Sequence, residues 1–208
     1  MKGLNFNLIS IIDYGVGNLL SVKKALEFLN IQSILTKDIK EIEKSSAIIL
    51  PGVGAFPSAM KSLNNKGLTN ILIEQARQKP FLGICLGMQL LFQKSCEFSE
   101  CDGLGLIDGE IVKINANGLK IPHMGWNDLK FINQSPLLNG INEGDFVYFV
   151  HSYRAETKDE NINAYTVYGE KIPALVSKGN VFGAQFHPEK SSSVGLKILK
   201  NFVELIKQ

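Results

Sequence analysis

Two short runs of residues carry side chains that could do covalent chemistry. The run GICLGMQ, residues 83–89, contains Cys85, and the run QFHPEKS, residues 185–191, contains His187 and Glu189. A thiol is a good nucleophile only after it loses its proton, so it needs a base within hydrogen-bond reach and a third group that orients the base. Cys85, His187 and Glu189 match these three roles, which predicts a nucleophilic catalytic site.

The spacing within each run supports this interpretation. Pro188 favours an extended backbone at the residue before it, and alternate side chains of an extended chain point the same way, so His187 and Glu189 can share a face. Cys85 follows an apolar run and precedes residues of helical character, 88–92. A strand, a nucleophile between small residues and a helix form a nucleophile elbow. A helix start also favours a thiolate and an oxyanion.

Each run has a simpler interpretation when it is taken alone. A cysteine between apolar residues is usually a small buried hydrophobic residue, and an isolated HPE tripeptide is usually a turn. Here both runs occur in one chain, and Gly83 and Gly87 flank the cysteine as an elbow requires. The combination favours catalysis.

The composition indicates a globular protein. With 208 residues, 45% of them hydrophobic, the chain is long enough for one sizeable core, so we expect a single domain over residues 1–208. Basic and acidic residues are interspersed and the net charge is only +2, which argues against a nucleic-acid partner. No apolar run approaches the length of a membrane span, so no membrane partner is expected.

The other two cysteines, Cys96 and Cys101, are interpreted as structural thiols. The three cysteines form no CxxC pair and have no histidines at zinc-binding spacing, so neither a metal nor another cofactor is predicted. Their odd number and the lack of a signal peptide predict a reducing, cytoplasmic location.

The first half of the chain alternates strands with helices. Residues 8–12 are predicted to form a buried strand, followed by a turn at Gly15 and Gly17 and then by a helix with one apolar face. Residues 47–50 form a second strand, and residues 71–76 are helical in composition. This βαβ pattern predicts the α/β class, with a largely parallel central sheet flanked by helices.

The second half consists of short strands between Gly, Asn and Pro turns, so extra antiparallel strands are expected there. The candidate strands span residues 110–114, 145–150, 165–168, 174–177 and 181–186. A closing helix with an apolar face is predicted after N-cap candidates at 191–193. The polar residues 156–163 are interpreted as a surface loop.

GICLGMQ and QFHPE together resemble the class I glutamine amidotransferases, whose glutaminase uses a Cys, His and Glu triad on an α/β fold. Four further runs resemble the branch of that family that serves imidazole glycerol phosphate synthesis in histidine biosynthesis. They are DYGVGN (13–18), PGVGAF (51–56), PHMGWN (122–127) and YFVHSY (148–153). The motifs cover nearly the whole chain. DYGVGN is a poor dinucleotide fingerprint, because Leu20 stands where the third glycine belongs.

The resemblance implies a role for each residue of the site. Cys85 attacks the side-chain amide of glutamine, His187 passes a proton to the leaving ammonia, and Glu189 orients His187. Backbone N–H groups stabilise the oxyanion of the intermediate. The implied oxyanion donors are Leu86, Gly52 and Val53.

The same resemblance implies contacts to the substrate glutamine. The implied substrate-binding residues are Gln89, Glu97, Ser152 and Tyr153. Glu97 suits the ammonium group of glutamine, and a solvated charge at the end of a helix is the alternative. Ser152 and Tyr153 are expected to bind the carboxylate of glutamine through their backbone.

The implied partner is a separate (β/α)8-barrel synthase (cyclase) subunit, with which the chain forms a heterodimer. That subunit accepts the ammonia and makes imidazole glycerol phosphate and an aminoimidazole carboxamide ribotide. Protonated ammonia is no longer a nucleophile, so a partner has to cover the site. The residues expected near the interface are Asn18, Met124, Trp126, Tyr148 and Lys190. The alternative for Trp126 is a core aromatic residue.

Other interpretations stay open at this stage. The same glutaminase chemistry could supply ammonia to a paralogous synthase, for example one that builds amidino groups on sugars. A stand-alone cysteine hydrolase with similar elbow geometry would need no partner. His123 and His151 lack a carboxylate two residues further on, and we interpret both as structural or interface residues rather than as the base.

Overall fold

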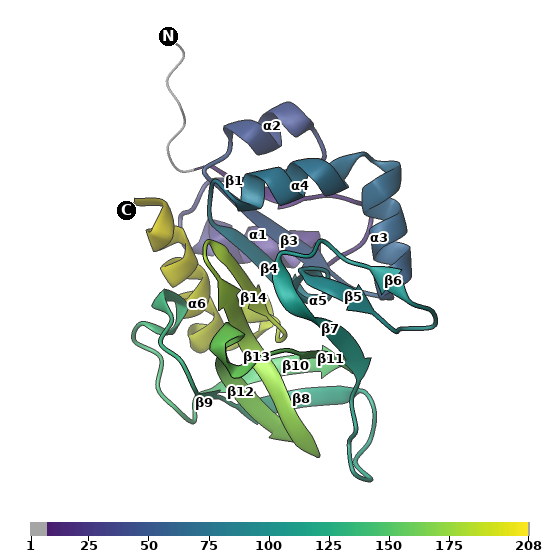
Figure 1. Ribbon diagram of the computed structural model, residues 1–208. Coiled ribbons are helices and arrows are strands. Elements are labelled where there is room, and N and C mark those ends of the chain that lie inside the picture. The colour runs from purple at the N-terminus through teal and green to yellow at the C-terminus, as the bar shows by residue number, and fades with distance from the viewer. Residues whose placement is uncertain (1–7, 208) are drawn as a thin grey trace.

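An eight-stranded sheet forms the centre of the computed structural model, which describes residues 8–207 (Figure 1). Across the sheet the strands are β2 (Ser33–Thr36), β1 (Ile9–Ile12), β3 (Ala47–Gly52), β4 (Phe81–Cys85), β14 (Val181–Ala184), β13 (Glu170–Lys178), β12 (Ile162–Tyr168) and β9 (Lys130–Phe131). The first five are parallel, and each later strand pairs antiparallel with its neighbour. The predicted α/β class is confirmed. The ends of the predicted domain, residues 1–7 and 208, lie outside the described residues.

Helices cover both faces of this sheet, because successive residues of its central strands point to opposite faces. On β3, Ile49 packs in one hydrophobic cluster and Ile48 in the other. The helices on the first face are α1 (Leu19–Phe28) and α6 (Ser192–Glu204), and those on the second are α2 (Ile39–Lys44), α3 (Phe56–Asn65) and α4 (Leu68–Ala76). The cores on both faces hold the parallel strands in place, so their carboxyl ends form a rigid edge.

Two smaller sheets complete the second half. One pairs β8 (His123–Asp128) with β10 (Phe146–His151), and the other has the order β11 (Tyr153–Glu156), β7 (Ile107–Lys113), β5 (Phe92–Ser95) and β6 (Cys101–Asp102). Short 3-10 helices are η1 (Pro136–Leu138), η2 (Asp159–Asn161), η3 (Pro188–Lys190) and η4 (Leu205–Lys207). The five strands predicted for this half are present, with shifted ends.

The helix predicted after Cys85 is shorter than expected. It is α5 (Leu86–Gln89), and Phe92, the last residue of the predicted helix, already begins β5. The carbonyl of Leu90 accepts a hydrogen bond from Leu104 N–H at 2.8 Å, and the carbonyl of Leu91 accepts one from Leu106 N–H at 2.8 Å. These long-range bonds take the backbone out of the helical path, so tertiary pairing overrides local helix propensity.

The predicted surface loop at 156–163 is also partly wrong. Residues 158–160 are exposed, but Asn161, Ile162 and Asn163 are buried, and β12 begins within the segment. The Asn133 side chain donates hydrogen bonds to the carbonyls of Asp159 and Ile162 at 2.6 and 2.8 Å. A side chain distant in sequence therefore fixes a segment that looks like a polar loop.

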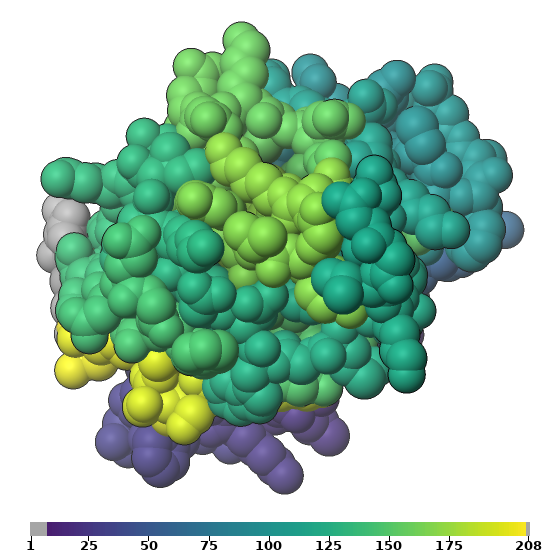
Figure 2. All heavy atoms as spheres, turned by 90° about the horizontal axis from the view of Figure 1, so that it is seen from below, coloured from purple at the N-terminus to yellow at the C-terminus, as the bar shows by residue number. Residues whose placement is uncertain are grey.

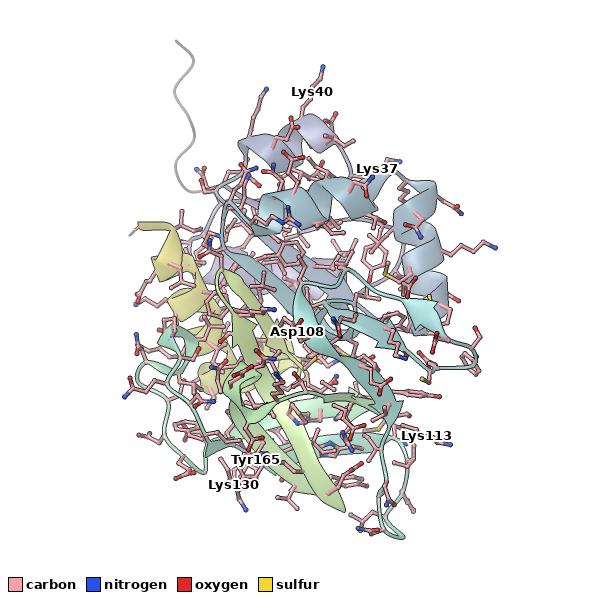
Figure 3. All side chains as sticks on the ribbon, in the orientation of Figure 1. Lys37, Lys40, Asp108, Lys113, Lys130 and Tyr165 are labelled. Carbon is pink, nitrogen blue, oxygen red and sulfur yellow. The ribbon has the colours of Figure 1, made fainter. Side chains whose placement is uncertain are left out.

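Lysine side chains lie at both ends of the molecule. In Figure 3, Lys37 and Lys40 lie at the upper end of the molecule and Lys113 and Lys130 at the lower end. The face seen from below in Figure 2 is made mostly of the second half of the chain, in teal and green, with the purple N-terminal segment at one edge. Within residues 8–207, no helix has the length and apolar character needed to cross a membrane.

Candidate active site

Three neighbouring strands bring the predicted site residues together. Gly52 ends β3 and is paired with Cys85 at the end of β4, while β14, on the other side of β4, leads to His187. Because the strands are parallel, these residues meet at one carboxyl edge of the sheet, which is where α/β folds form their sites. The fold therefore joins two motifs that are about a hundred residues apart in the sequence.

The turn at Cys85 has the strain of a nucleophile elbow. Cys85 has φ of 55° and ψ of −113°, a backbone conformation that side chains rarely adopt. A Cβ on Gly83 would lie 2.5 Å from the carbonyl oxygen of Gly87, and a Cβ on Gly87 would lie 1.7 Å from that of Leu50. Both glycines are sterically required, because backbone atoms occupy the space of any side chain.

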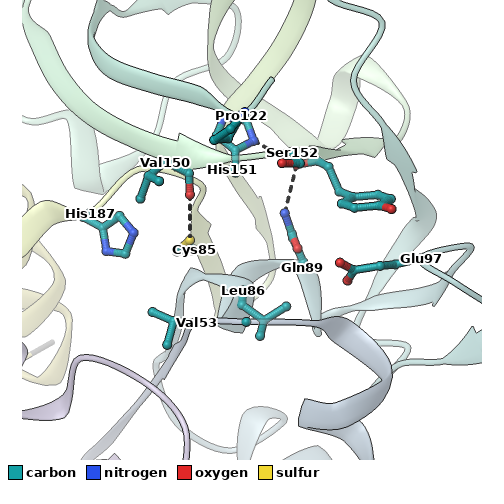
Figure 4. A pocket seen from close by; sticks show the side chains of 12 residues that line it. Val53, Cys85, Leu86, Gln89, Glu97, Pro122, Val150, His151, Ser152 and His187 are labelled. Atoms are coloured by element: carbon teal, nitrogen blue, oxygen red, sulfur yellow. Dashed lines mark hydrogen bonds between the residues drawn. The ribbon is translucent and has the colours of Figure 1, made fainter. Parts of the chain in front are cut away.

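A cavity of about 320 Å³ lies over this elbow (Figure 4). Its lining includes most of the residues predicted for the site: Val53, Cys85, Leu86, Gln89, Glu97, Ser152, Tyr153 and His187. Gly52 is absent from the lining, since it lies behind Leu86, and a Cβ there would be 3.0 Å from the Cβ of Leu86. Glu189 is also outside the lining and contacts the site through His187.

His187 and Glu189 form a buried pair. Nδ1 of His187 lies 2.8 Å from Oε1 of Glu189, and both side chains are almost fully buried. Burial by itself lowers the pKa of His187, but the nearby Cys85 thiol and the hydrogen-bonded Glu189 carboxylate outweigh it and raise that pKa to about 9. The ring faces Cys85 in Figure 4. The arrangement suits an imidazole that gains and loses a proton beside a thiol.

Other groups of the second half hold this pair and the thiol. Sγ of Cys85 contacts the carbonyl oxygen of Val150 at 3.8 Å. The backbone N–H of His187 donates to the carbonyl of Tyr148 at 2.9 Å. The buried hydroxyl of Ser191 donates to the His187 carbonyl at 2.7 Å and accepts from the N–H of Tyr148 at 2.9 Å. Ser191 was predicted as an N-cap; it occupies that position, but its side chain makes no capping bond.

Glu97 is a buried carboxylate on the opposite wall. One of its oxygens accepts a hydrogen bond from Phe56 N–H at 2.7 Å, and within residues 8–207 no basic side chain pairs with it. Buried carboxylates are normally paired with a cation. This burial does not fit the alternative of a solvated surface charge.

Gln89 has both amide hydrogens engaged by the protein. Its Nε2 donates to the carbonyl oxygen of Tyr153 at 2.9 Å and to Oε1 of Gln185 at 3.0 Å. Only its own carbonyl oxygen remains to accept a hydrogen bond from a ligand. Gln185 was not predicted as part of the site, because no local sequence signal distinguishes it from an ordinary strand residue.

The residues predicted at a partner interface are all at least partly exposed. Trp126 and Met124 are 52% and 61% exposed, so Trp126 is not a core residue of this chain. Trp126 and Tyr148 are cross-strand partners whose rings meet edge to face at 6.0 Å, and Lys190 Nζ lies 6.0 Å from the Tyr148 ring. Asn18 stands at the N-terminus of α1 and is half-buried.

The other two thiols, Cys96 and Cys101, do not line the cavity. Cys96 is exposed and Cys101 is partly buried, and all three cysteines are free. Across the described part of the chain, no group of three or more His, Cys, Asp or Glu side chains is arranged to hold a metal ion.

The elbow at Cys85 and the pair of His187 and Glu189 on an α/β sheet are the features of one enzyme family. The family model for class I glutamine amidotransferases matches residues 10–206, and the chain belongs to this family. It is 54% identical to imidazole glycerol phosphate synthase subunit HisH of Bacillus cereus (strain ATCC 14579), over 94% of this chain and 93% of that protein. It is 53% identical to the protein of the same name from Bacillus thuringiensis (strain Al Hakam), with the same coverage.

Solved structures share this fold at lower sequence identity. A crystal structure of a glutamine amidotransferase superposes with a TM-score of 0.75 at 20% identity and covers 96% of this chain and 99% of its own. The structure of PurLQS from Thermotoga maritima also gives a TM-score of 0.75, at 23% identity, with 95% and 98% coverage.

Proposed function

We propose that this chain is the glutaminase subunit of imidazole glycerol phosphate synthase and acts in histidine biosynthesis as one domain. The observation that carries this proposal is the cavity itself, where a thiol with a histidine and glutamate pair faces a buried, unpaired carboxylate. The first group attacks an amide, and the second suits the ammonium of a free amino acid. A cavity of about 320 Å³ is at the small end of ligand pockets, which favours a free amino acid over a peptide.

The reaction proceeds in two halves on the same thiol. The Cys85 thiolate attacks the carboxamide carbon of glutamine, and protonated His187 gives its proton to the departing nitrogen, so ammonia leaves and a thioester remains. His187 then takes a proton from water, whose oxygen attacks the thioester and releases glutamate and the thiol. Glu189 holds the ring in the orientation that both steps need.

Negative charge develops on the former carbonyl oxygen in both halves. Leu86 begins α5, so its N–H has no acceptor within the helix and is available to that oxygen. The turn at Gly52 and Val53 supplies the second donor. Gly54, with φ of 95°, gives that turn a path that a side chain would strain.

The substrate is held at both ends of its backbone. Glu97 binds the ammonium group, and the backbone at Ser152 and Tyr153 binds the carboxylate. Gln89 accepts a hydrogen bond from the substrate with its one remaining oxygen, since its amide hydrogens are engaged. These contacts leave the carboxamide end of glutamine directed at Cys85.

The exposed side chains of Met124 and Trp126, together with Tyr148, form the docking face for a (β/α)8-barrel synthase subunit. Large apolar residues exposed together are typical of interfaces, and the aromatic pair Trp126 and Tyr148 is a suitable anchor. Docking there would cover the cavity, so that ammonia passes to the synthase before water protonates it. Both subunits are expected in the cytoplasm, whose reducing conditions keep the three free thiols reduced.

Covalent labelling tests the glutaminase proposal. A glutamine-like electrophile such as a diazoketone analogue should label Cys85 once per chain, and glutamine should protect against labelling. Cys85→Ala should abolish the label, whereas Cys96→Ser, a matched change at an exposed thiol, should leave it intact. Labelling that glutamine does not reduce would contradict an amidotransferase and favour a general cysteine hydrolase.

The partner is tested by adding the synthase. Glutaminase activity should be weak in the isolated chain and rise strongly with the synthase and its nucleotide ligand. The Cys85→Ala chain should leave ammonia-dependent synthesis by the partner intact. Equal glutaminase activity with and without the histidine-pathway synthase would assign the chain to another acceptor.

A further inference from the structure

The two histidines that the proposed reaction does not use form a buried hydrogen-bonded chain along one wall of the cavity. Nδ1 of His151 lies 2.8 Å from the carbonyl oxygen of Tyr153, and Nε2 of His151 lies 3.0 Å from Nδ1 of His123. Nε2 of His123 lies 3.3 Å from the side-chain nitrogen of Asn127. His151 itself lines the cavity.

The partners at each end dictate where the protons lie. A carbonyl oxygen only accepts, so Nδ1 of His151 carries a hydrogen and donates it to Tyr153. Burial keeps both rings neutral by lowering the pKa of His151 to about 3 and that of His123 to about 4. Nε2 of His151 is then an acceptor, and Nδ1 of His123 has to donate to it. The amide of Asn127 completes the chain by donating to the other nitrogen of His123.

Aromatic stacking holds the ring of His123, whose Nδ1 hydrogen fixes the tautomer of His151. His123 lies between Phe149 and Tyr168, with ring centroids 4.7 and 4.2 Å away and planes inclined by only 23° and 21°. The ring cannot turn without losing both contacts. The side-chain nitrogen of Asn127 is held in turn by a second hydrogen bond, to the carbonyl of Val167 at 3.1 Å.

The hydrogen-bonded series of side chains ends at a backbone segment that lines the cavity. Ser152 and Tyr153 form the corner between β10 and β11, and both line the cavity. The Tyr153 carbonyl accepts from His151 and from Gln89 at the same time, and the carbonyl of Ser152 accepts from the N–H of Ile114 at 3.0 Å. Side chains as well as strand pairing therefore set the shape of this corner.

We propose that His123 and His151 are positioning residues for the substrate: His123 holds His151 in the tautomer that donates to Tyr153, and this fixes the corner that receives the carboxylate of glutamine. The proposal rests on the proposed glutaminase function. It predicts an effect on substrate binding more than on reaction, because Cys85 and His187 are held by separate contacts with Val150 and Tyr148.

Nitrogen NMR of the full chain tests the tautomers directly. At neutral pH the spectrum of the wild-type protein should show both His123 and His151 neutral and protonated at Nδ1, although the Nε2-protonated form is the usual one in solution. The chain has three histidines, so single substitutions assign every signal. An Nε2-protonated His151 would overturn the proposal, whatever substrate the enzyme uses.

Three substitutions of His123 separate hydrogen bonding from packing. His123→Phe keeps the stacked ring and removes the donor, whereas the amide of His123→Asn reaches the position of Nδ1 and keeps it. His123→Gln places its amide near Nε2, where it meets Asn127 and not His151. The readout is labelling of Cys85 by the diazoketone analogue, whose concentration dependence separates binding, KI, from reaction with the thiol, kinact.

The Phe and Gln variants should raise KI about tenfold with kinact within about twofold, because a buried acceptor loses its donor, and the Asn variant should stay near wild type. Unchanged KI in a folded Phe variant, or an Asn variant as weak as the Phe variant, would overturn the positioning role. Failure of glutamine to protect the wild-type chain would instead refute the glutaminase function, and the two failures are therefore distinguishable.

Discussion

The two walls of the cavity use histidine in opposite charge states. His187, His123 and His151 are all at least nine-tenths buried, so burial lowers the pKa of each. On one wall Glu189 and Cys85 reverse that effect and raise the pKa of His187 to about 9. On the other wall the hydrogen-bond partners are neutral, and the pKa values of His123 and His151 fall to about 4 and 3. Burial therefore keeps a ring neutral where its partners are neutral, and a charged partner reverses this effect at His187.

The charged and the neutral imidazoles suit different roles. An imidazole with a carboxylate partner is stable in its charged form, so it can take up and release a proton during a reaction. An imidazole with neutral partners keeps one tautomer and gives a fixed hydrogen-bond pattern, which suits a structural wall. Substitutions that change one wall at a time show whether the other wall responds.

The largest effect is expected from removing the negative charge of the first wall. Glu189→Gln keeps the size of the side chain but gives Nδ1 of His187 a neutral partner, so the pKa of His187 should fall and its ring should lose a fixed tautomer. We expect kcat for glutamine hydrolysis to fall by about 10²–10⁴-fold, with KM little changed. Steady-state kinetics across pH measure both. A variant with wild-type kcat would show that Glu189 does not support the base.

A smaller effect is expected from Glu97→Gln, which removes a charge from the far side of the cavity. Loss of a buried charge pair with the substrate ammonium should raise KM for glutamine by about 10–100-fold and leave kcat within a few-fold. Glu100→Gln is the matched control, because Glu100 lies on the same loop but its side chain is 69% exposed and pairs with Lys94. Equal KM values in the two variants would exclude Glu97 from ammonium binding.

Much of the arrangement of Cys85, His187 and Glu189 could be predicted, because the sequence patterns that indicate it lie within short segments. The apolar run before Cys85 predicts a buried strand, the flanking glycines predict the elbow, and the two-residue spacing predicts that His187 reaches Glu189. Parallel order then follows from the βαβ pattern and brings the two motifs to one edge. The distances in this structure agree with that reasoning, while the catalytic roles stay predictions.

The second wall was not predictable, because it depends on pairing between distant segments. His123 meets His151 only because β8 and β10 pair in the register that sets them opposite each other. A slip of one residue would turn either ring to the other face of its strand. For the same reason the short helix α5 and the buried residues 161–163 were missed, since long-range hydrogen bonds override their local patterns.

The hydroxyl of Ser191 is expected to hold His187 in place in the first wall. Ser191→Ala removes the hydroxyl that joins the His187 carbonyl to the N–H of Tyr148, which leaves a partly buried N–H without an acceptor. We expect the free energy of unfolding to fall by about 1–3 kcal/mol and kcat to fall a few-fold. Ser193→Ala, at an exposed position of the same segment, should change neither. Urea unfolding and steady-state kinetics measure the pair, and matching stabilities would remove Ser191 from the support of His187.

The smallest expected effect is the pH dependence of the free energy of unfolding, to which the histidines of both walls contribute. The pKa of His187 is higher in the folded state than the usual 6.5, so its stabilising contribution is present below pH 6.5 and is lost as pH rises through about 9. His123 and His151 have lowered pKa values, so only the unfolded chain binds protons there as pH falls from 6.5 toward 4, and stability decreases. The histidine contribution therefore declines in both directions from pH 6.5.

Single substitutions should flatten one side of this profile at a time. Glu189→Gln should weaken the loss of stability between about pH 7 and pH 9, and His123→Asn should weaken the loss between about pH 6.5 and pH 5, where few carboxyl groups titrate. Differences from wild type in urea unfolding isolate these contributions from other groups. The charge of His187 is the smallest of the causes that lower the pKa of His151, so Glu189→Gln should move the acid side only a little. If His123→Asn changed the alkaline side, or Glu189→Gln changed the acid side as much as the alkaline side, the separation of tasks between the two walls would not hold.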